Sequence, residues 1–261
     1  MKQREFVKTE KDGRLLLVTI NRAEVMNSVH PPANFEMEEV FNEFAADPEL
    51  WVAIVTGAGE KAFSAGNDLK YQASGGKMST PATGFGGLTN RYDLTKPVIA
   101  AVNGVAMGGG FEIALACDLI IAAENATFAL PEPRVGLAAL AGGLHRLPRQ
   151  IGLKQAMGMI LTGRHVSAKE GKELGFVNDV APAGQSVEVA KKWAAQILDL
   201  SPMSIRASKE AVYKGLEEPT VAAGIANQSK YPAVAAMFRS DDLKEGPMAF
   251  AQKRKPNWKG A

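Results

Sequence analysis

The residue types best suited to chemistry lie in a glycine-rich stretch that is followed by an acid. An apolar run begins at Val98 and is interrupted by Gly104 and by glycines 108–110, after which Glu112 enters a helix-forming segment. A turn between strand and helix directs unpaired backbone N–H groups toward whatever lies above it, and glycine leaves those donors uncovered. Donors beside a carboxylate suit reactions that form an oxyanion or an enolate. Close packing of a helix on a sheet would use the same glycines.

The spacing of the glycines argues against two kinds of nucleotide site. The dinucleotide fingerprint is G-x-G-x-x-G, whereas residues 104–110 read G-V-A-M-G-G-G. A phosphate-binding P-loop would need Gly-Lys-Ser or Gly-Lys-Thr after the glycines, and Phe111 follows instead.

A second turn can supply another donor. In the segment F-S-A-G-N-D, residues 63–68, a sharp turn after a strand would offer the backbone N–H of Asn67. Together with the N–H of Gly109 it would form a two-donor hole for a thioester oxygen. An ordinary turn fits the same letters. Ser64 lacks the G-x-S-x-G context of a hydrolase nucleophile.

A second acid, Glu132, lies between Pro131 and Pro133, just beyond an apolar run. The two prolines restrict the backbone, so the carboxyl group has a defined place. A solvated loop charge is the alternative for this residue taken singly.

The candidate residues must be positioned by the strands and helices around them. These are expected to alternate along the chain, which predicts an α/β fold with parallel pairing and right-handed crossovers. Strands are expected at 14–20, 51–56, from 98, at 119–122, 127–130 and 176–180, and helices at 34–46, from the capping box at Ser167 to Gly175, and at 187–200, 202–214, 221–239 and 241–252. Residues 74–87 are rich in Gly, Ser, Thr and Pro, which indicates a mobile loop or lid. Two regions follow: a core over 1–200 and a helical region over 201–261.

Composition indicates a globular protein. Of 261 residues, 46% are hydrophobic and 22% are charged, and the net charge of +2 gives no support for a nucleic-acid surface. No run has the length of a membrane span or the pattern of a signal sequence, and the single cysteine, Cys117, fits a reducing compartment, so we expect a cytoplasmic protein without membrane association. Three scattered histidines give no metal-ligand spacing, so no metal is expected.

Taken together, the motifs resemble the crotonase (enoyl-CoA hydratase/isomerase) superfamily over almost the whole chain. They are F-S-A-G-N-D-L-K, P-V-I-A-A-V-N-G, G-G-G-F-E-I-A-L-A-C-D and F-A-L-P-E. The resemblance implies a spiral of ββα units with a helical C-terminal region, and a homotrimer or dimer of trimers in which that region packs against neighbours. It also implies a coenzyme A (CoA) thioester as substrate and no separate cofactor.

The resemblance assigns roles residue by residue. The oxyanion donors fall on the backbone N–H groups of Asn67 and Gly109, and the two acids of family hydratases fall on Glu112 and Glu132. We expect Glu112 mainly to activate water and Glu132 mainly to deliver a proton, in syn addition of water to a trans-2-enoyl-CoA.

Binding of CoA is expected around the first donor turn, at Arg22, Ala65, Asp68, Leu69 and Lys70. The family usually has proline after the Gly-x-x that follows Glu132, whereas Ala139 stands here, and His145 lies close to a glycine pair. These departures concern the acyl group rather than the thioester chemistry.

Other functions stay open at this point. Two acids can also move a proton between carbons, as in a double-bond isomerase, and the substrate can carry a functional group such as a quaternary ammonium. Such a cation would need acidic or aromatic surroundings, for which Tyr71, Phe85 and Tyr92 are candidates. A catalytically silent acyl-CoA-binding subunit is the third alternative, although it would not need both acids.

Overall fold

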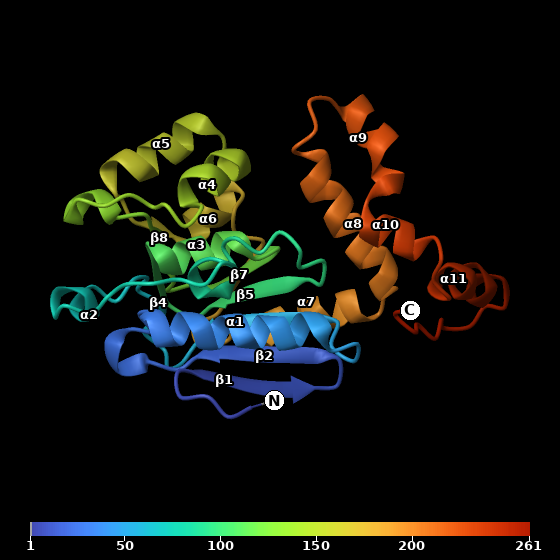
Figure 1. The fold of residues 1–261 in the computed structure, drawn as a ribbon, viewed down its shortest axis with the longest axis horizontal. Helices are drawn as coiled ribbons and strands as arrows, with labels where there is room; N and C mark the ends of the chain where they lie inside the picture. Colours follow the sequence, from blue (N-terminus) through green and yellow to red (C-terminus); the bar gives the residue numbers. More distant parts are fainter. Residues whose placement is uncertain (1) are drawn as a thin grey trace.

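The computed structural model describes residues 2–261 and has two sheets (Figure 1). The larger sheet has the order β1-β2-β3-β5-β7-β10 and the smaller one β4-β6-β8-β9. The strands are β1 (Val7–Asp12), β2 (Leu15–Ile20), β3 (Val52–Gly57), β4 (Ala62–Ser64), β5 (Val98–Val102), β6 (Val105–Met107), β7 (Leu119–Ala123), β8 (Thr127–Ala129), β9 (Val166–Ser167) and β10 (Asp179–Ala181). All pairs are parallel except β1 with β2 and β8 with β9, so the expected α/β class and parallel pairing are confirmed.

Helices surround the sheets. They are α1 (Pro31–Ala46), α2 (Leu69–Ala73), α3 (Gly109–Ala116), α4 (Gly143–Ile151), α5 (Leu153–Thr162), α6 (Ala168–Leu174), α7 (Ser186–Leu198), α8 (Pro202–Gly215), α9 (Val221–Asn227), α10 (Pro232–Met237) and α11 (Asp242–Ala251). Short 3-10 turns are η1 (Ala23–Val25), η2 (Phe85–Gly87), η3 (Glu132–Val135) and η4 (Gln228–Lys230). The expected helix start at Ser167 is confirmed, because its hydroxyl accepts a hydrogen bond from Glu170 N–H at the start of α6. The second bond of a capping box is not formed, since Glu170 Oε1 pairs with Arg164 Nη1 at 2.7 Å instead.

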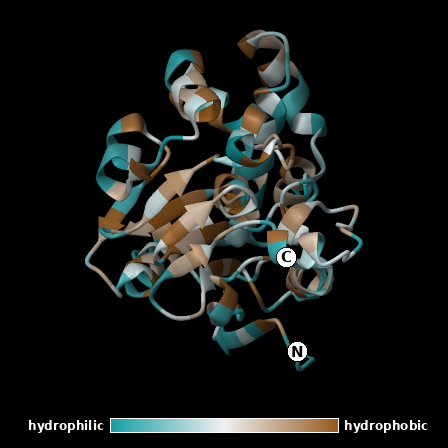
Figure 2. Ribbon diagram, turned by 90° about the vertical axis from the view of Figure 1, so that its left-hand side faces the viewer, coloured by the Kyte–Doolittle hydropathy of each residue, from teal (hydrophilic) through white to brown (hydrophobic). Residues whose placement is uncertain are grey.

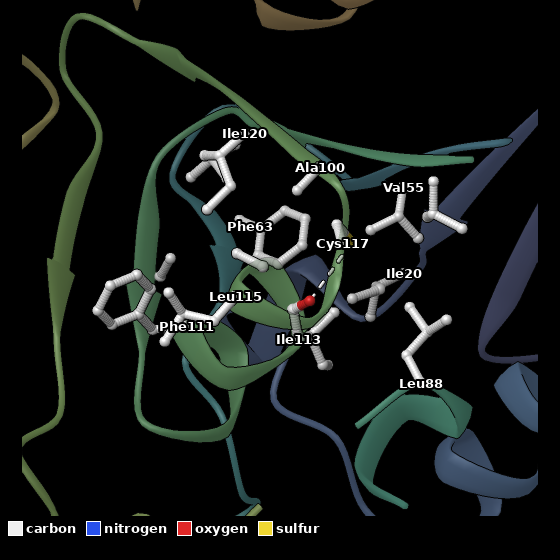
Figure 3. Packing of buried hydrophobic residues seen from close by; sticks show 14 of the residues in the cluster. Ile20, Val55, Phe63, Leu88, Ala100, Phe111, Ile113, Leu115, Cys117 and Ile120 are labelled. Carbon is white, nitrogen blue, oxygen red and sulfur yellow. Dashed lines mark hydrogen bonds between the residues drawn. The ribbon is translucent and has the colours of Figure 1, made fainter. Parts of the chain in front are cut away.

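The central strands of the large sheet are buried on both faces, and their side chains alternate between two apolar clusters. On β2, Leu16, Val18 and Ile20 join the main core, whereas Leu15 and Leu17 lie in a second cluster with Trp193 and Ile197 of α7. Figure 2 shows the strands as the most hydrophobic part of the ribbon. Figure 3 shows the main core around α3, where Phe63, Ile113 and Leu115 lie close together and the Cys117 thiol is hydrogen-bonded to Ile113 O.

Asn103 connects the two sheets at the point where β5 ends and β6 begins. Its amide Nδ2 donates to Gly59 O at 2.7 Å and to Ala62 O at 3.2 Å, and its Oδ1 accepts from Gly57 N–H at 3.2 Å. At Gly104 a side chain would collide with the carbonyl of Lys61. The Asn-Gly pair therefore fixes β4 beside β6, and with it the turn that follows β4.

Several expectations about the elements were wrong. The edge strand β1 was missed because its charged residues give no apolar run, and its pattern is mostly exposed. The strand β6 was missed because three residues between glycines carry no periodicity. The helix expected over 221–239 is divided into α9, η4 and α10, since Pro232 starts a new helix instead of continuing the old one.

The loop expected over 74–87 is only partly open. Its first half is mostly exposed, but Pro81 and the turn Phe85–Gly87 are buried. The Gly86 N–H donates to Asn34 Oδ1 at 2.7 Å, and Thr83 Oγ1 donates to Glu38 Oε1 at 2.8 Å, so the second half is attached to α1. This half is a wall of the molecule rather than a free lid.

Helices α8–α11 extend from the sheets on the side opposite α4 and α5 (Figure 1). A small cluster of their own, built on Ala207, Tyr231 and Val234, holds α8 and α10 together. A division at residue 200 into core and helical region stays a prediction. Of the helices in residues 2–261, none combines the length and apolar character needed to cross a membrane.

Candidate active site

Three neighbouring parallel strands of the small sheet end at one edge, and each leads into a part of the site. The strand β4 leads to the turn with Asn67, β6 leads to Gly109, and β8 leads to Glu132. Gly108 N–H donates to Ala129 O at 3.0 Å, which joins the second and third of these segments directly. Residues far apart in the sequence therefore meet because the strands that carry them are adjacent.

Gly66, which precedes the expected donor Asn67, lies against the start of α3, where the second expected donor, Gly109, is found. Gly66 has φ +86°, and a Cβ at that position would lie 2.8 Å from the Gly109 nitrogen and 2.6 Å from Met107 O. The Gly109 N–H is at the first turn of α3, where a helix provides no backbone acceptor. Gly66 therefore keeps the turn before Asn67 in contact with the start of α3, and a side chain there would block the Gly109 donor.

Glu112 lies one turn further along α3 and is only 3% exposed. Its Oε1 accepts a hydrogen bond from Gly143 N–H at 2.8 Å, at the start of α4. Burial raises the pKa of Glu112 to about 7, the Gly143 hydrogen bond opposes the rise, and the negative charge of Glu132 adds to it. A carboxyl group with this pKa can be ionised or protonated near neutral pH, which suits acid–base catalysis.

Glu132 approaches the same place from η3. A Cβ at Gly108 would lie 2.9 Å from Glu132 Oε1, so the carboxyl group is next to the donor turn. Its Oε2 is buried and has no hydrogen-bond partner within the described chain. Burial raises the pKa of Glu132 as well. A buried acidic oxygen without a protein partner is available to a ligand or to water.

The residues expected to bind CoA lie around α2, but they differ in their contacts. Arg22 Nη1 donates to Asp68 Oδ2 at 2.9 Å, and both side chains are largely buried. Asp68 also caps α2 by accepting from Tyr71 N–H at 3.0 Å. Burial alone would raise the pKa of Asp68, but the hydrogen bonds from Tyr71 and Arg22 lower it overall. Arg22 and Asp68 thus shape the turn.

The other three residues of that group are more accessible. Lys70 is exposed and forms no ion pair within residues 2–261, Leu69 is 43% exposed, and Ala65 is half-buried with its N–H bonded to Met26 O. Lys70 is therefore the one cation of the group whose charge is free for a ligand.

Sequence reasoning missed two contributors to the site, Gly143 and Arg146, and proposed Phe85 only as aromatic surroundings for a cation. Phe85 covers the donor turn, since a Cβ at Gly109 would lie 2.5 Å from its Cε1. Gly143 orients Glu112, and Arg146 lies nearby on α4 with its Nη2 bonded to Thr89 O. The glycine pair 142–143 was the available signal for a helix start that points an N–H at an acid. His145, singled out in the sequence, is exposed on α4.

A metal site does not emerge from the acidic residues. Over residues 2–261, no three or more His, Cys, Asp or Glu side chains are grouped so that they could hold a metal ion.

Comparisons with known proteins identify the family of the chain. The family model for enoyl-CoA hydratase/isomerase matches residues 10–261. The chain belongs to this family. A carnitinyl-CoA dehydratase of Salmonella typhi is 44% identical over 98% of this chain and 99% of its own length.

Two solved structures are similar to the family member described here. An enoyl-CoA hydratase from Mycobacterium tuberculosis H37Rv has a TM-score of 0.92 at 37% identity, covering 98% of this chain and 99% of that one. A carnitinyl-CoA hydratase from Mycobacterium avium has a TM-score of 0.78 at 39% identity, covering 99% and 100%. The family resemblance and the crotonase-like fold expected from the motifs are thereby confirmed.

Proposed function

We propose that this protein catalyses the reversible syn addition of water to a trans-2-enoyl-CoA thioester. The observation that carries the proposal is the convergence of Glu112, Glu132 and the Gly109 donor at the ends of adjacent elements. The thioester oxygen would accept hydrogen bonds from the N–H groups of Asn67 and Gly109, which stabilise the enolate that forms when water adds at Cβ.

The two acids divide the proton transfers. Ionised Glu112, held by Gly143 N–H, takes a proton from the attacking water. Protonated Glu132, whose Oε2 is buried without a partner in the described chain, gives a proton to Cα. Hydration thus leaves Glu112 protonated and Glu132 ionised, and transfer of a proton from Glu112 to Glu132, directly or through water, restores the starting state. In the reverse direction, dehydration of the 3-hydroxyacyl-CoA, Glu132 accepts the Cα proton and Glu112 protonates the leaving hydroxyl group.

A more specific substrate is suggested by the relatives named carnitinyl-CoA dehydratase. We propose a functionalised acyl group, with a quaternary ammonium as one option. The three aromatic candidates differ in their support for it. Phe85 contacts the donor turn, whereas Tyr71 packs against His30 and the Tyr92 face lies 6.0 Å from the Arg146 guanidinium. Phe85 and the two acids are thus the groups best placed for such a cation.

The assembly that we propose is a homotrimer or a dimer of trimers. Large apolar side chains of the helical region are exposed in the single chain and would be covered by neighbouring copies; they include Val212, Leu216 and Phe238. Sedimentation velocity is expected to show a trimer or larger, and a stable monomer would contradict this part of the proposal. The reaction needs no cofactor beyond the CoA of the substrate, and Cys117 fits a cytoplasmic location.

The function is tested by mixing the enzyme with crotonyl-CoA and with its γ-trimethylammonium derivative. Loss of the absorbance of the conjugated thioester, together with a product heavier by one water, is the expected result. A shifted alkene of unchanged mass would indicate an isomerase. Absence of turnover with bound substrate would indicate a silent binding subunit, and the ratio of kcat/KM for the two thioesters would decide the acyl group.

A further inference from the structure

Arg146 contacts two walls of the candidate site with one guanidinium group. It lies on α4, one turn after the helix begins at Gly143, and its backbone N–H donates to Gly142 O at 2.8 Å. Its Nη1 lies against Gly142, where any Cβ would collide with it, and its Nη2 donates to Thr89 O at 2.8 Å. The side chain therefore connects the start of α4 to the segment that follows η2.

Through Thr89, Arg146 is connected to the turn that carries Phe85, which packs against the proposed oxyanion donor Gly109. Thr89 Oγ1 accepts a hydrogen bond from Phe85 N–H at 2.8 Å, which closes the turn η2. The ring of Phe85 then lies against the backbone of Gly109, as its 2.5 Å approach to a Cβ placed there shows. A movement of Thr89 would therefore move the ring that packs against Gly109.

Through Gly142, Arg146 is connected to the start of α4, which carries the hydrogen-bond donor to Glu112. Gly142 and Gly143 form the start of α4, and Gly143 N–H is the donor that holds Glu112 Oε1 at 2.8 Å. Two charged groups act on Glu112 from the elements packed around it, Glu132 on η3 and Arg146 on α4. Burial is the main cause of the raised pKa of Glu112, the charge of Glu132 raises it further, and the positive charge of Arg146 opposes this.

We propose that Arg146 is a positioning residue that holds Phe85 over the Gly109 donor and Gly143 against Glu112 at the same time. The inference rests on the proposed hydration reaction and adds a residue that touches neither substrate nor the reacting water. Its two effects are separable, because the contact with Thr89 O is a hydrogen bond and the effect on Glu112 includes charge.

Three variants separate these effects. Arg146→Gln removes the charge, Arg146→Lys keeps the charge but loses the planar fork that spans Gly142 and Thr89 O, and Thr89→Val removes only the acceptor for Phe85 N–H. Arg149→Gln is the matched control, since Arg149 is an exposed cation on the same helix that bonds to His145 O. Thermal unfolding checks that each variant is folded.

Two readouts are needed: the pH dependence of kcat/KM, and an infrared titration of the Glu112 carboxyl group in the free protein, assigned with Glu112→Gln. For Arg146→Gln we expect the acidic limb and the carboxyl titration to move together to higher pH, by up to about one unit, with kcat about tenfold lower. Arg146→Lys and Thr89→Val should lower kcat several-fold without moving either titration.

The proposal is overturned if Arg146→Gln leaves both titrations in place, or if Arg149→Gln moves them equally. It is also overturned if Thr89→Val has the kcat of the unchanged enzyme. Should the unchanged protein fail to hydrate any enoyl-CoA, the proposed reaction is wrong, but the infrared titration still shows whether Arg146 acts on Glu112.

Discussion

The two acids of the site lie in regions that hold a carboxyl group in different ways. Glu112 is on a helix, almost completely buried, and bonded to Gly143 N–H. Glu132 is on the short turn η3 between two prolines, half-buried, with Oε2 unbonded to any described group. A side chain fixed at one oxygen can orient a water molecule, whereas an unbonded oxygen can approach carbon and deliver a proton. This difference in hydrogen bonding and burial is the physical basis of the two roles that we propose for Glu112 and Glu132.

The largest effects on activity are expected when each acid in turn is replaced by its neutral amide. Glu112→Gln and Glu132→Gln are each expected to lower kcat by about 10²–10⁴-fold while CoA binding persists, because each removes one proton transfer. The double variant should lose less than the product of the two effects, since both act on one water. Near-normal hydration by either single variant would remove that residue from the mechanism.

Variants of the proposed oxyanion hole test the backbone N–H of Gly109, which lies at the start of the helix that carries Glu112. Gly109→Pro removes a backbone donor, and Gly66→Ala places a Cβ 2.8 Å from that donor, so each should lower kcat by about 10²–10³-fold. Asn67→Ala is the control. It keeps the backbone N–H and loses only a 3.2 Å contact to Gln72, so its kcat should change by a small factor. Equal damage in all three would show that the Asn67 side chain touches the substrate.

The pH dependence of the free energy of unfolding is expected to differ in size between the buried acid, Glu112, and the half-buried acid, Glu132. The pKa of Glu112 is raised from 4.5 to about 7 in the folded protein, so the fold binds this proton more tightly than the unfolded chain does. Ionisation then destabilises the fold, and the cost develops as the pH rises from about 4.5 to about 7.

Glu112→Gln should therefore be more stable than the unchanged protein at pH 8, by up to about 3 kcal/mol, and no more stable at pH 4.5. Urea unfolding at one protein concentration and both pH values measures this. Glu132→Gln should show a smaller gain, and a larger gain there would reverse the assignment of the more buried acid.

The smallest effect is expected away from both acids. Lys70→Ala should raise KM a few-fold at low salt and leave kcat unchanged, since a phosphate contact is equally strong in ground and transition states. Arg22→Ala is a useful comparison, because the guanidinium is paired with Asp68 and its loss should also destabilise the turn. An unchanged KM for Lys70→Ala would remove that residue from CoA binding.

Sequence patterns predicted the parts of the molecule that depend on local composition. The apolar strands of the large sheet, the helix start at Ser167, the parallel pairing and the glycine turn before α3 all follow from residue types over short windows. The charged edge strand β1 and the three-residue strand β6 gave no such pattern, and Pro232 divided a helix that periodicity alone would continue.

The site was less predictable because its supports are distant in sequence. The family motif placed Glu112, Glu132 and the two donors, but nothing local connects Phe85 to Gly109 or Arg146 to Thr89. These contacts depend on how α1, η2 and α4 pack, which is a property of the whole core. The residues that we propose to touch the reacting atoms thus lie in recognisable motifs, whereas those that we propose to hold them do not.

The common edge of β4, β6 and β8 has a consequence for how this enzyme could acquire new substrates. The two proposed donors and Glu132 lie within a few residues of the ends of β4, β6 and β8. The later part of the loop after η3 and the segment 74–80 lie further along the chain from these strand ends. Insertions or exchanges in those two segments would leave the proposed donors and Glu132 in place. Chain length and polarity of the substrate can therefore drift under selection while the reaction itself is inherited unchanged.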